Sequence, residues 1–280
     1  MKPTRRRGPL GAACLALALG ALAWAAVAQE AAEPAPSAAP EATAESELDA
    51  EALEIAKRAF DFLREQPRFS FRAETGYEVV QADGSKLEFG SWKSYTVKRP
   101  ESVRFETEQR DGDRRLTVFD GKMLTVSDPN RDVYAQVTFD KPRDIDDFVT
   151  VARDRLEMPV PLAELLKNDP RKAMEDSLEV AYLVGEEKIA GAECDHLAFR
   201  NPDVDAQLWF SRGAQPTLRR IVITYRTLEG QPSFWANLSD WSFAPKLSEA
   251  TFKFTPGPES SRIRFALAPP AAATPEGSAR

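Results

Sequence analysis

The chain of 280 residues carries 44 acidic side chains against 37 lysines and arginines, which gives a formal net charge of −7 at pH 7. Proteins that bind nucleic acid or anionic membrane surfaces depend on an excess of basic side chains, so this balance excludes both kinds of partner. Of the two cysteines, only Cys194 lies beyond the apolar N-terminal segment. We therefore expect no intramolecular disulfide and a fold that depends on its hydrophobic core.

The first 28 residues indicate export. Arginines at positions 5–7 precede an apolar run that ends in the Ala-Val-Ala of residues 26–28. This arrangement is typical of a secretory signal peptide, with cleavage expected before Gln29. An uncleaved membrane anchor is the alternative, because the run is about long enough to span a bilayer. Cys14 stands early in the apolar run, so we do not expect lipidation there. Cleavage would place the protein in the periplasm, with the Gram-negative bacterium that this implies as its source.

The ends of the mature chain differ in composition from its body. Residues 29–45 consist mainly of Ala, Pro and Glu, without large apolar side chains, and predict a disordered linker. The tail, residues 267–280, has the same character. Between them, residues 46–266 are the right length for one large, mainly β domain.

A single helix is predicted to open this domain. Ser46 is its expected N-cap, with Asp49 three residues on, as in a capping box. Apolar residues then recur at spacings of three and four, as on one face of a helix, and Pro67 ends the pattern. The residues on this face are Leu48, Ala52, Ile55, Ala59 and Phe62.

After this helix the apolar period changes to two, which predicts half-buried strands. The first strand has Phe69, Phe71, Ala73, Tyr77 and Val79 on one face, and the second, after the turn at 83–84, has Leu87, Phe89, Tyr95 and Val97. The alternation of the second strand slips near residues 90–91 and Trp92 falls out of phase, which predicts a β-bulge.

Further short strands follow around Val103 and Phe105, around 116–118 and over 133–137. A helical insertion interrupts them: residues 144–156 place Ile145, Phe148, Val149, Ala152 and Leu156 at helical spacing, and 161–170 add a short helical piece. The acidic 144–147 segment is interpreted as the first turn of a helix rather than as a cation site. Strands are then predicted at 179–184, 186–190, 193–200, 205–211, 217–228 and 232–243, with a last one near Phe252 and Phe254.

The expected fold class is mainly β with accessory helices (α+β). About eleven strands form a curved antiparallel half-barrel, with a leading helix and a helical lid. The apolar face of such a sheet must be buried against something, and two or three short helices are too few to cover it fully. We therefore expect an apolar concavity that is incompletely filled.

Cys194 and His196 are the candidates for catalysis, because two residues apart on a strand they share a face. A cysteine nucleophile needs a base and a group that orients it, but Asp195 points to the opposite face. Zinc needs three or four ligands, and the mature chain offers one cysteine and one histidine. A structural role on a central strand is favoured over a reactive thiol, and a metal site is favoured least. No cofactor is expected.

The stretch 95–137 resembles the periplasmic outer-membrane lipoprotein carrier family. It contains a strand ending in Lys98-Arg99-Pro100, a strand with Val103 and Phe105, an Asp-Gly-Lys turn at 120–122 and an Asp-Pro turn at 128–129. The segment 250–263 resembles the closing F-x-F-x-P segment of that family. The resemblance implies an eleven-stranded half-barrel whose apolar interior shelters acyl chains. It also implies that Arg99 hydrogen-bonds to the lid and holds it shut; a surface arginine at a strand end is the alternative.

A closer resemblance is to a family of predicted periplasmic proteins of unknown function that shares this fold. It rests on "PLAELL" at 161–166, "VGEEKIAGAECDHLAF" at 184–199 and "DAQLWF" at 205–210. Lipoprotein transport itself does not follow from it, because the partner-binding features of the carriers cannot be located in this chain.

These observations predict a non-enzymatic, monomeric periplasmic protein that binds an acyl chain or similar lipid-like ligand. An envelope protein–protein interaction module with a filled core is the alternative, and an enzyme that depends on Cys194 is less favoured. Arg99 is the expected lid latch, and the expected lid residues are Ile145, Phe148 and Val149. The expected wall residues are Phe69, Phe71, Tyr77, Leu87, Phe89, Tyr95, Val103 and Phe105.

Overall fold

The computed structural model of the chain describes residues 48–172 and 178–265. The expected signal peptide, linker, tail and Ser46 cap lie outside these residues. Within them, no helix has the length and apolar character that crossing a membrane requires.

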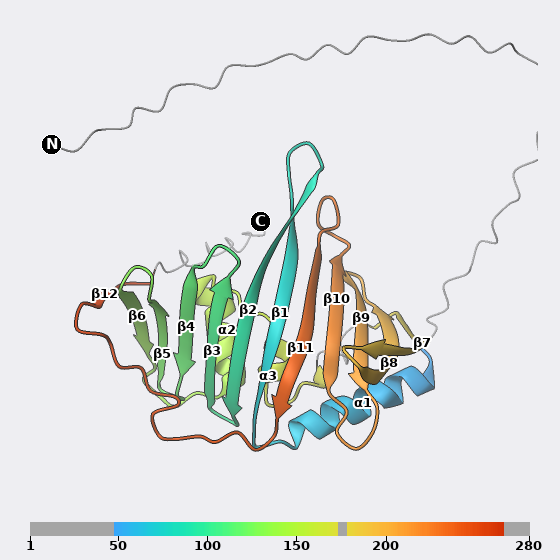
Figure 1. The fold of residues 1–280 in the computed structure, drawn as a ribbon, viewed down its shortest axis with the longest axis horizontal. Coiled ribbons are helices and arrows are strands. Elements are labelled where there is room, and N and C mark those ends of the chain that lie inside the picture. Colours follow the sequence, from blue (N-terminus) through green and yellow to red (C-terminus); the bar gives the residue numbers. More distant parts are fainter. Residues whose placement is uncertain (1–47, 173–177, 266–280) are drawn as a thin grey trace, which may run out of the picture. The chain divides into compact units, whose positions relative to one another are not determined.

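Twelve strands form one sheet in the order β12-β6-β5-β4-β3-β2-β1-β11-β10-β9-β8-β7 (Figure 1). Its two end strands do not pair with each other, so the sheet stays open. The helices are α1 (Ala50–Arg64), α2 (Ile145–Leu156) and α3 (Ala163–Leu166). The strands are β1 (Arg68–Val80), β2 (Lys86–Lys98), β3 (Ser102–Gln109), β4 (Arg114–Phe119), β5 (Met123–Asp128), β6 (Val133–Thr138), β7 (Val180–Ile189), β8 (Ala192–Arg200), β9 (Val204–Ser211), β10 (Leu218–Tyr225), β11 (Ser233–Ser242) and β12 (Ser261–Ile263).

The mainly β, curved and largely antiparallel fold predicted from the sequence is confirmed, with corrections to individual strands. The apolar periodicity did not single out β5, and the two strands expected at 179–184 and 186–190 are the one strand β7. Gly185, which separates the two expected strands, instead marks a register shift within β7, where its φ of 151° is open to glycine.

The last expected strand, near Phe252 and Phe254, is wrong. Phe252 is buried and the Phe254 ring packs against Tyr134 at a centroid distance of 5.2 Å, so these aromatic residues fasten a loop. The last strand is β12, which pairs with β6 and is parallel to it.

The leading helix begins three residues later than predicted, with its N-cap at Asp49 instead of Ser46. Asp49 is the N-cap of α1, and its carboxylate accepts a hydrogen bond from the backbone N–H of Glu51 at 2.8 Å. Leu48 therefore precedes the helix, where it forms an isolated bridge with Ala181. From this start, α1 packs against β7, β8 and β9 at one end of the sheet (Figure 1).

The helical insertion has the predicted form. Asp144 caps α2 by accepting a hydrogen bond from the backbone N–H of Asp147 at 2.8 Å, so the acidic segment is the start of a helix. The predicted short helical piece is α3. Ile145, Phe148 and Val149 of α2 are buried in the core over the β3–β5 part of the sheet, where Phe148 stacks on Phe119 at 5.1 Å.

The bulge expected in β2 is absent: the strand pairs with β1 without a break from Lys86 to Lys98. Gly90 needs no bulge to explain it, because a Cβ there would lie 2.5 Å from the guanidinium carbon of Arg110. Trp92 points to the opposite face and is 51% exposed. The odd-numbered residues of β2 therefore share the concave, core-facing side throughout, and they include the polar residues Ser91 and Lys93.

Candidate functional site

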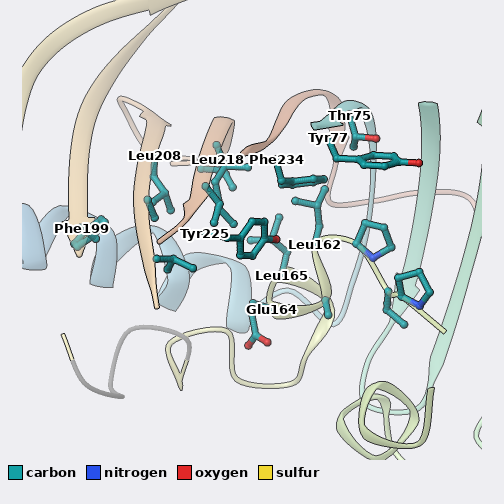
Figure 2. Close-up of a pocket in the computed structure, with 18 of the residues that line it drawn as sticks. Thr75, Tyr77, Leu162, Glu164, Leu165, Phe199, Leu208, Leu218, Tyr225 and Phe234 are labelled. Atoms are coloured by element: carbon teal, nitrogen blue, oxygen red, sulfur yellow. The ribbon is translucent and has the colours of Figure 1, made fainter. Parts of the chain in front are cut away.

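A cavity of about 800 Å³ lies on the concave side of the sheet, between its strands and the segment 159–165 (Figure 2). Its size falls within the range of small-molecule sites in proteins. Most of its wall is aliphatic or aromatic. The strands and α1 contribute Phe60 of α1; Thr75 and Tyr77 of β1; Ser91 and Lys93 of β2; Gln109 of β3; Phe199 and Arg200 of β8; Val204, Ala206 and Leu208 of β9; Leu218, Ile221, Ile223 and Tyr225 of β10; and Phe234 of β11. The segment 159–165 and the loop residues Leu178 and Asn201 complete the lining.

Strand alternation produces this apolar wall. Along β9 the even-numbered residues face the cavity, and Leu208 of this set lies opposite Ile221 of β10 in the strand register. Phe234 of β11 faces Ile223 in the same way. Figure 2 shows Leu208, Leu218 and Phe234 reaching the same space from three neighbouring strands.

The segment 159–165 covers the cavity and is held to the sheet by Tyr95. The hydroxyl of Tyr95, which is almost fully buried, donates a hydrogen bond to the carbonyl oxygen of Pro161 at 3.0 Å. Leu162 lines the cavity with its backbone in the left-handed region, at φ 57°, a conformation that is costly for a leucine. The covering segment therefore stores some backbone strain.

Arg99, the residue after β2, holds the end of the same segment. Its guanidinium donates hydrogen bonds to three carbonyl oxygens at the C-terminal end of α3, those of Leu165 at 3.3 Å, Leu166 at 2.8 Å and Lys167. Carbonyls at a helix C-terminus have no partner within the helix, and a planar group with five donors suits them. Burial lowers the pKa of Arg99 to about 10, so it remains charged at neutral pH. The contact has the geometry that the expected latch requires; the latch role itself stays a prediction.

A polar strip crosses the cavity wall on β1 and β2. Thr75 and Ser91 face each other in the register, with their hydroxyl oxygens 2.9 Å apart. The Nζ of Lys93 donates to the Ser91 hydroxyl at 2.8 Å and lies 3.5 Å from the Thr107 hydroxyl. Lys93 is only 7% exposed, opposite the small side chain of Ala73. Sequence reasoning missed this strip.

Burial is the larger cause and the nearby positive charge of Arg115 on β4 the smaller one, and together they lower the pKa of Lys93 to about 8. Burial disfavours the charged form of a lysine, and a second cation acts in the same direction. A carboxylate partner would oppose both effects, but no acidic side chain among the described residues lies within ion-pair distance of Lys93.

Of the eight wall residues expected from the sequence, Tyr77 alone is among those that line the cavity. Leu87 and Phe89 are about half exposed on the β1–β2 hairpin, which projects beyond the neighbouring strands (Figure 1). The other five are buried in the packed core: Phe69, Phe71, Tyr95, Val103 and Phe105. The expected lid residues Ile145, Phe148 and Val149 belong to that core as well.

A signal for the polar strip was present in the sequence. Thr75 belongs to the apolar face of β1 by its odd number, and Ser91 and Lys93 belong to that of β2. As polar residues they do not contribute to an apolar pattern, so in β2 they resemble an interruption of the strand by a bulge. An unbroken two-residue alternation, with polar residues at a few of the inward-facing positions, would have identified them.

The surroundings of Cys194 and His196 favour the structural interpretation over the catalytic one. The Cys194 side chain is fully buried, its thiol lies 3.4 Å from the carbonyl oxygen of Ala192, and burial raises its pKa. Both ring nitrogens of His196 have partners at 3.0 Å, a carboxylate oxygen of Glu187 and the amide oxygen of Gln207. A thiol with a raised pKa and an imidazole with both nitrogens occupied do not form an activated nucleophile.

His196 belongs to a row of side chains on the convex face. It stacks on Trp209 at 4.0 Å, and the indole N–H of Trp209 donates to Glu187. Arg220 lies between Trp209 and Trp235, with its guanidinium carbon 5.6 and 5.8 Å from their rings. The hydrogen bonds of Glu187 and the stacking and cation–π contacts together join five neighbouring strands, β7 to β11, on the face opposite the cavity.

The model of the family described as "Predicted periplasmic protein (DUF2092)" matches residues 52–266. The chain belongs to this family, so the family expected from the sequence and the periplasmic location are confirmed. No curated protein matches the chain.

Solved structures with a similar fold include lipoprotein LppX of Mycobacterium tuberculosis (14% identity, 71% of this chain and 100% of that one, TM-score 0.43). They also include LprF of Mycobacterium bovis (14% identity, 75% and 99% of the two chains, TM-score 0.46). A LolA superfamily protein of Nitrosomonas europaea is similar at 13% identity over 72% of this chain and 97% of that one, with a TM-score of 0.35.

Proposed function

We propose that this member of the DUF2092 family is a non-enzymatic periplasmic protein that binds the acyl chain of a lipid in its cavity, in lipid or lipoprotein trafficking. The observation that carries the proposal is the 800 Å³ space with predominantly apolar walls that side chains leave open on the concave side. A space of that size lined by leucine, isoleucine and phenylalanine matches a flexible hydrocarbon chain better than a polar metabolite.

The energetics of such binding need no catalytic machinery. Each methylene group buried from water contributes about 0.8 kcal/mol. A chain of roughly a dozen buried methylenes therefore supplies about 10 kcal/mol, and with a cost of about 4 kcal/mol for the freedom lost on association this is enough for sub-millimolar binding.

The segment 159–165 is the proposed cover, with Arg99 and Tyr95 as its two fastenings. Tyr77 lines the cavity and stacks on Phe89 at 5.8 Å, so the apolar wall continues onto the exposed hairpin. This continuity supports a role for Phe89 and Leu87 as an apolar rim by which the chain of a ligand enters.

Native mass spectrometry of protein purified without detergent tests the proposal. We expect either a co-purified lipid or one-to-one binding of added hexadecanoic acid or hexadecanol after delipidation. Ile221→Trp, which fills the cavity from β10, is expected to abolish this binding. A matched exposed site, Ile263→Trp on β12, is expected to leave it unchanged. Failure of the native protein to bind any of these ligands would overturn the proposal.

A protein-interaction module is the second candidate, and the exposed apolar side chains of the β1–β2 hairpin favour it. Leu87, Phe89 and Trp92 of β2 are each about half exposed, with Trp92 on the face opposite to the other two. The double variant Leu87→Ser/Phe89→Ser separates the two candidates. Loss of an envelope partner with unchanged lipid binding supports an interaction surface, and slower lipid uptake with no partner lost supports a rim.

A further inference from the structure

We propose that the strip formed by Thr75, Ser91 and Lys93 is an anion site that holds the headgroup of the acyl ligand, so that the ligand is a carboxylate or phosphate amphiphile rather than a neutral lipid. This inference rests on the proposed function, because it names the chemical class of ligand for the same cavity. It assigns a polar role to a wall that is otherwise apolar.

The first argument is the isolation of Lys93. Its side chain is only 7% exposed, yet among the described residues its hydrogen-bond partners are the hydroxyl groups of Ser91 and Thr107 alone. Buried lysines are ordinarily paired with an acid, since an unpaired buried charge is costly. Among the residues that the structure describes, none supplies that negative charge.

The second argument is that another cationic side chain, Arg115, lies near Lys93. Arg115 of β4 pairs with Thr107 of β3, which in turn pairs with Lys93 of β2, so the three residues lie in one row across the sheet. Arg115 acts on the charge of Lys93 strongly enough to lower its pKa. Two cations on the same row with no carboxylate of the described residues between them repel each other, and a bound anion would reverse that repulsion.

The third argument is the supply of hydrogen-bond donors. The Ser91 hydroxyl accepts a hydrogen bond from Lys93, so its own hydrogen is available for Thr75 or for a ligand oxygen. The ammonium group of Lys93 has three hydrogens. An oxyanion in the cavity could therefore accept from the ammonium and from a hydroxyl together, and charge-assisted bonds of this kind are the stronger ones.

The position of the strip on the sheet sets the orientation of the ligand. On one side of it, Phe71 and Tyr95 are a stacked, fully packed pair, which closes that direction. The aliphatic wall of Leu208 and Ile221 lies on β9 and β10, across β1 and β11 from Lys93. A ligand whose head binds at Lys93 would therefore extend its tail toward β9 and β10.

The test compares ligands of one chain length and different heads: hexadecanoate, hexadecyl phosphate and hexadecanol. Their dissociation constants are measured at pH 7 by isothermal titration on the delipidated full chain, in the native form and in Lys93→Met. Lys98→Met, an exposed lysine at the end of the same strand, is the matched control. Methionine preserves the length and apolar stem of lysine without its charge.

We expect the native protein to bind one or both anions about 10- to 100-fold more tightly than the alcohol, the range of one charged hydrogen-bonded contact. In Lys93→Met this preference should disappear while hexadecanol binds as before, which also shows that the variant is folded. Preference for the carboxylate indicates a fatty acid, and preference for the phosphate indicates a phospholipid-type head.

Equal binding of all three ligands by the native protein would overturn the anion site and leave the acyl-binding function standing. So would an unchanged preference in Lys93→Met, or an equal loss in Lys98→Met. Absence of binding by every ligand would overturn the proposed function, and the anion site with it.

Discussion

One half of the concave face is filled by packed side chains and the other half borders a cavity, although one continuous sheet provides both halves. Over β3–β5, the side chains of α2 fill the space, and Phe148 stacks on Phe119 in a fully buried contact. Over β9–β11, the strands present side chains of similar size, yet a cavity of about 800 Å³ remains. The difference lies in what covers the sheet rather than in the sheet itself.

The covering elements explain this contrast. α2 presents a phenylalanine, an isoleucine, a valine and a leucine to the strands beneath it. At the other end, three of the six buried residues of α1 are alanines, against one of five in α2, and α1 packs mainly on β7–β9. The remaining cover is the segment 159–165, which is held by hydrogen bonds at Tyr95 and Arg99. A binding cavity can therefore arise in a β fold where a short fastened segment replaces a packed helix.

The largest expected effect is in the filled half. Phe148→Ala removes a fully buried ring and should lower the free energy of unfolding by about 3–5 kcal/mol. Phe234→Ala, on the cavity wall, should cost clearly less, because the Phe234 side chain is only partly buried and already borders open space. Urea denaturation of the two variants measures the difference. Equal losses would mean that the two halves are packed alike.

At the boundary between the halves, removal of a charge should stabilise the unliganded protein. A pKa that falls from 10.5 in the unfolded chain to about 8 in the fold corresponds to a cost on the order of 3 kcal/mol at neutral pH. Lys93→Met should therefore raise the free energy of unfolding by up to about that amount. A destabilised Lys93→Met would contradict the assignment of Lys93 as a buried lysine without an acidic partner.

The same cost should depend on pH in a defined direction. Below pH 8 Lys93 is charged in both states and the cost is complete; between pH 8 and 10.5 the unfolded state binds more protons, so stability rises with pH. The stability difference between Lys93→Met and the native protein should shrink across this window. Taking the difference cancels groups common to both proteins, including Arg115, Glu164, Tyr77 and Tyr225. A difference that stays constant from pH 7 to 10.5 would contradict the lowered pKa.

A smaller effect on stability, with a larger one on kinetics, is expected at the cover. Arg99→Met leaves three carbonyl oxygens at the end of α3 without their donor, at a cost of about 1–3 kcal/mol. Exchange of a bound fluorescent fatty acid should become faster, as measured by stopped-flow displacement. Arg99→Lys keeps the charge but loses the planar guanidinium, so its exchange rate should fall between those of the native protein and Arg99→Met. Unchanged exchange rates in both variants would show that Arg99 does not hold a lid.

The sequence predicted the fold well wherever periodicity was long and unbroken. The helical spacing in 144–156 and the two-residue period of β1 and β2 located α2 and the central hairpin, because burial of one face leaves a regular pattern. The position of the cavity could not be predicted in the same way. Phe71 and Tyr77 have the same pattern and lie on the same face of β1, and only the tertiary position of α2 and 159–165 decides which is packed and which borders open space.

The most direct test of the contrast is a crystal structure with 16-bromohexadecanoic acid, whose bromine marks the end of the acyl chain. The anomalous signal is predicted beside Leu208 and Ile221, with the carboxylate at Lys93 and the core beneath α2 unchanged. A bromine position between α2 and β3–β5, or on the outer surface with no density in the cavity, would contradict the account.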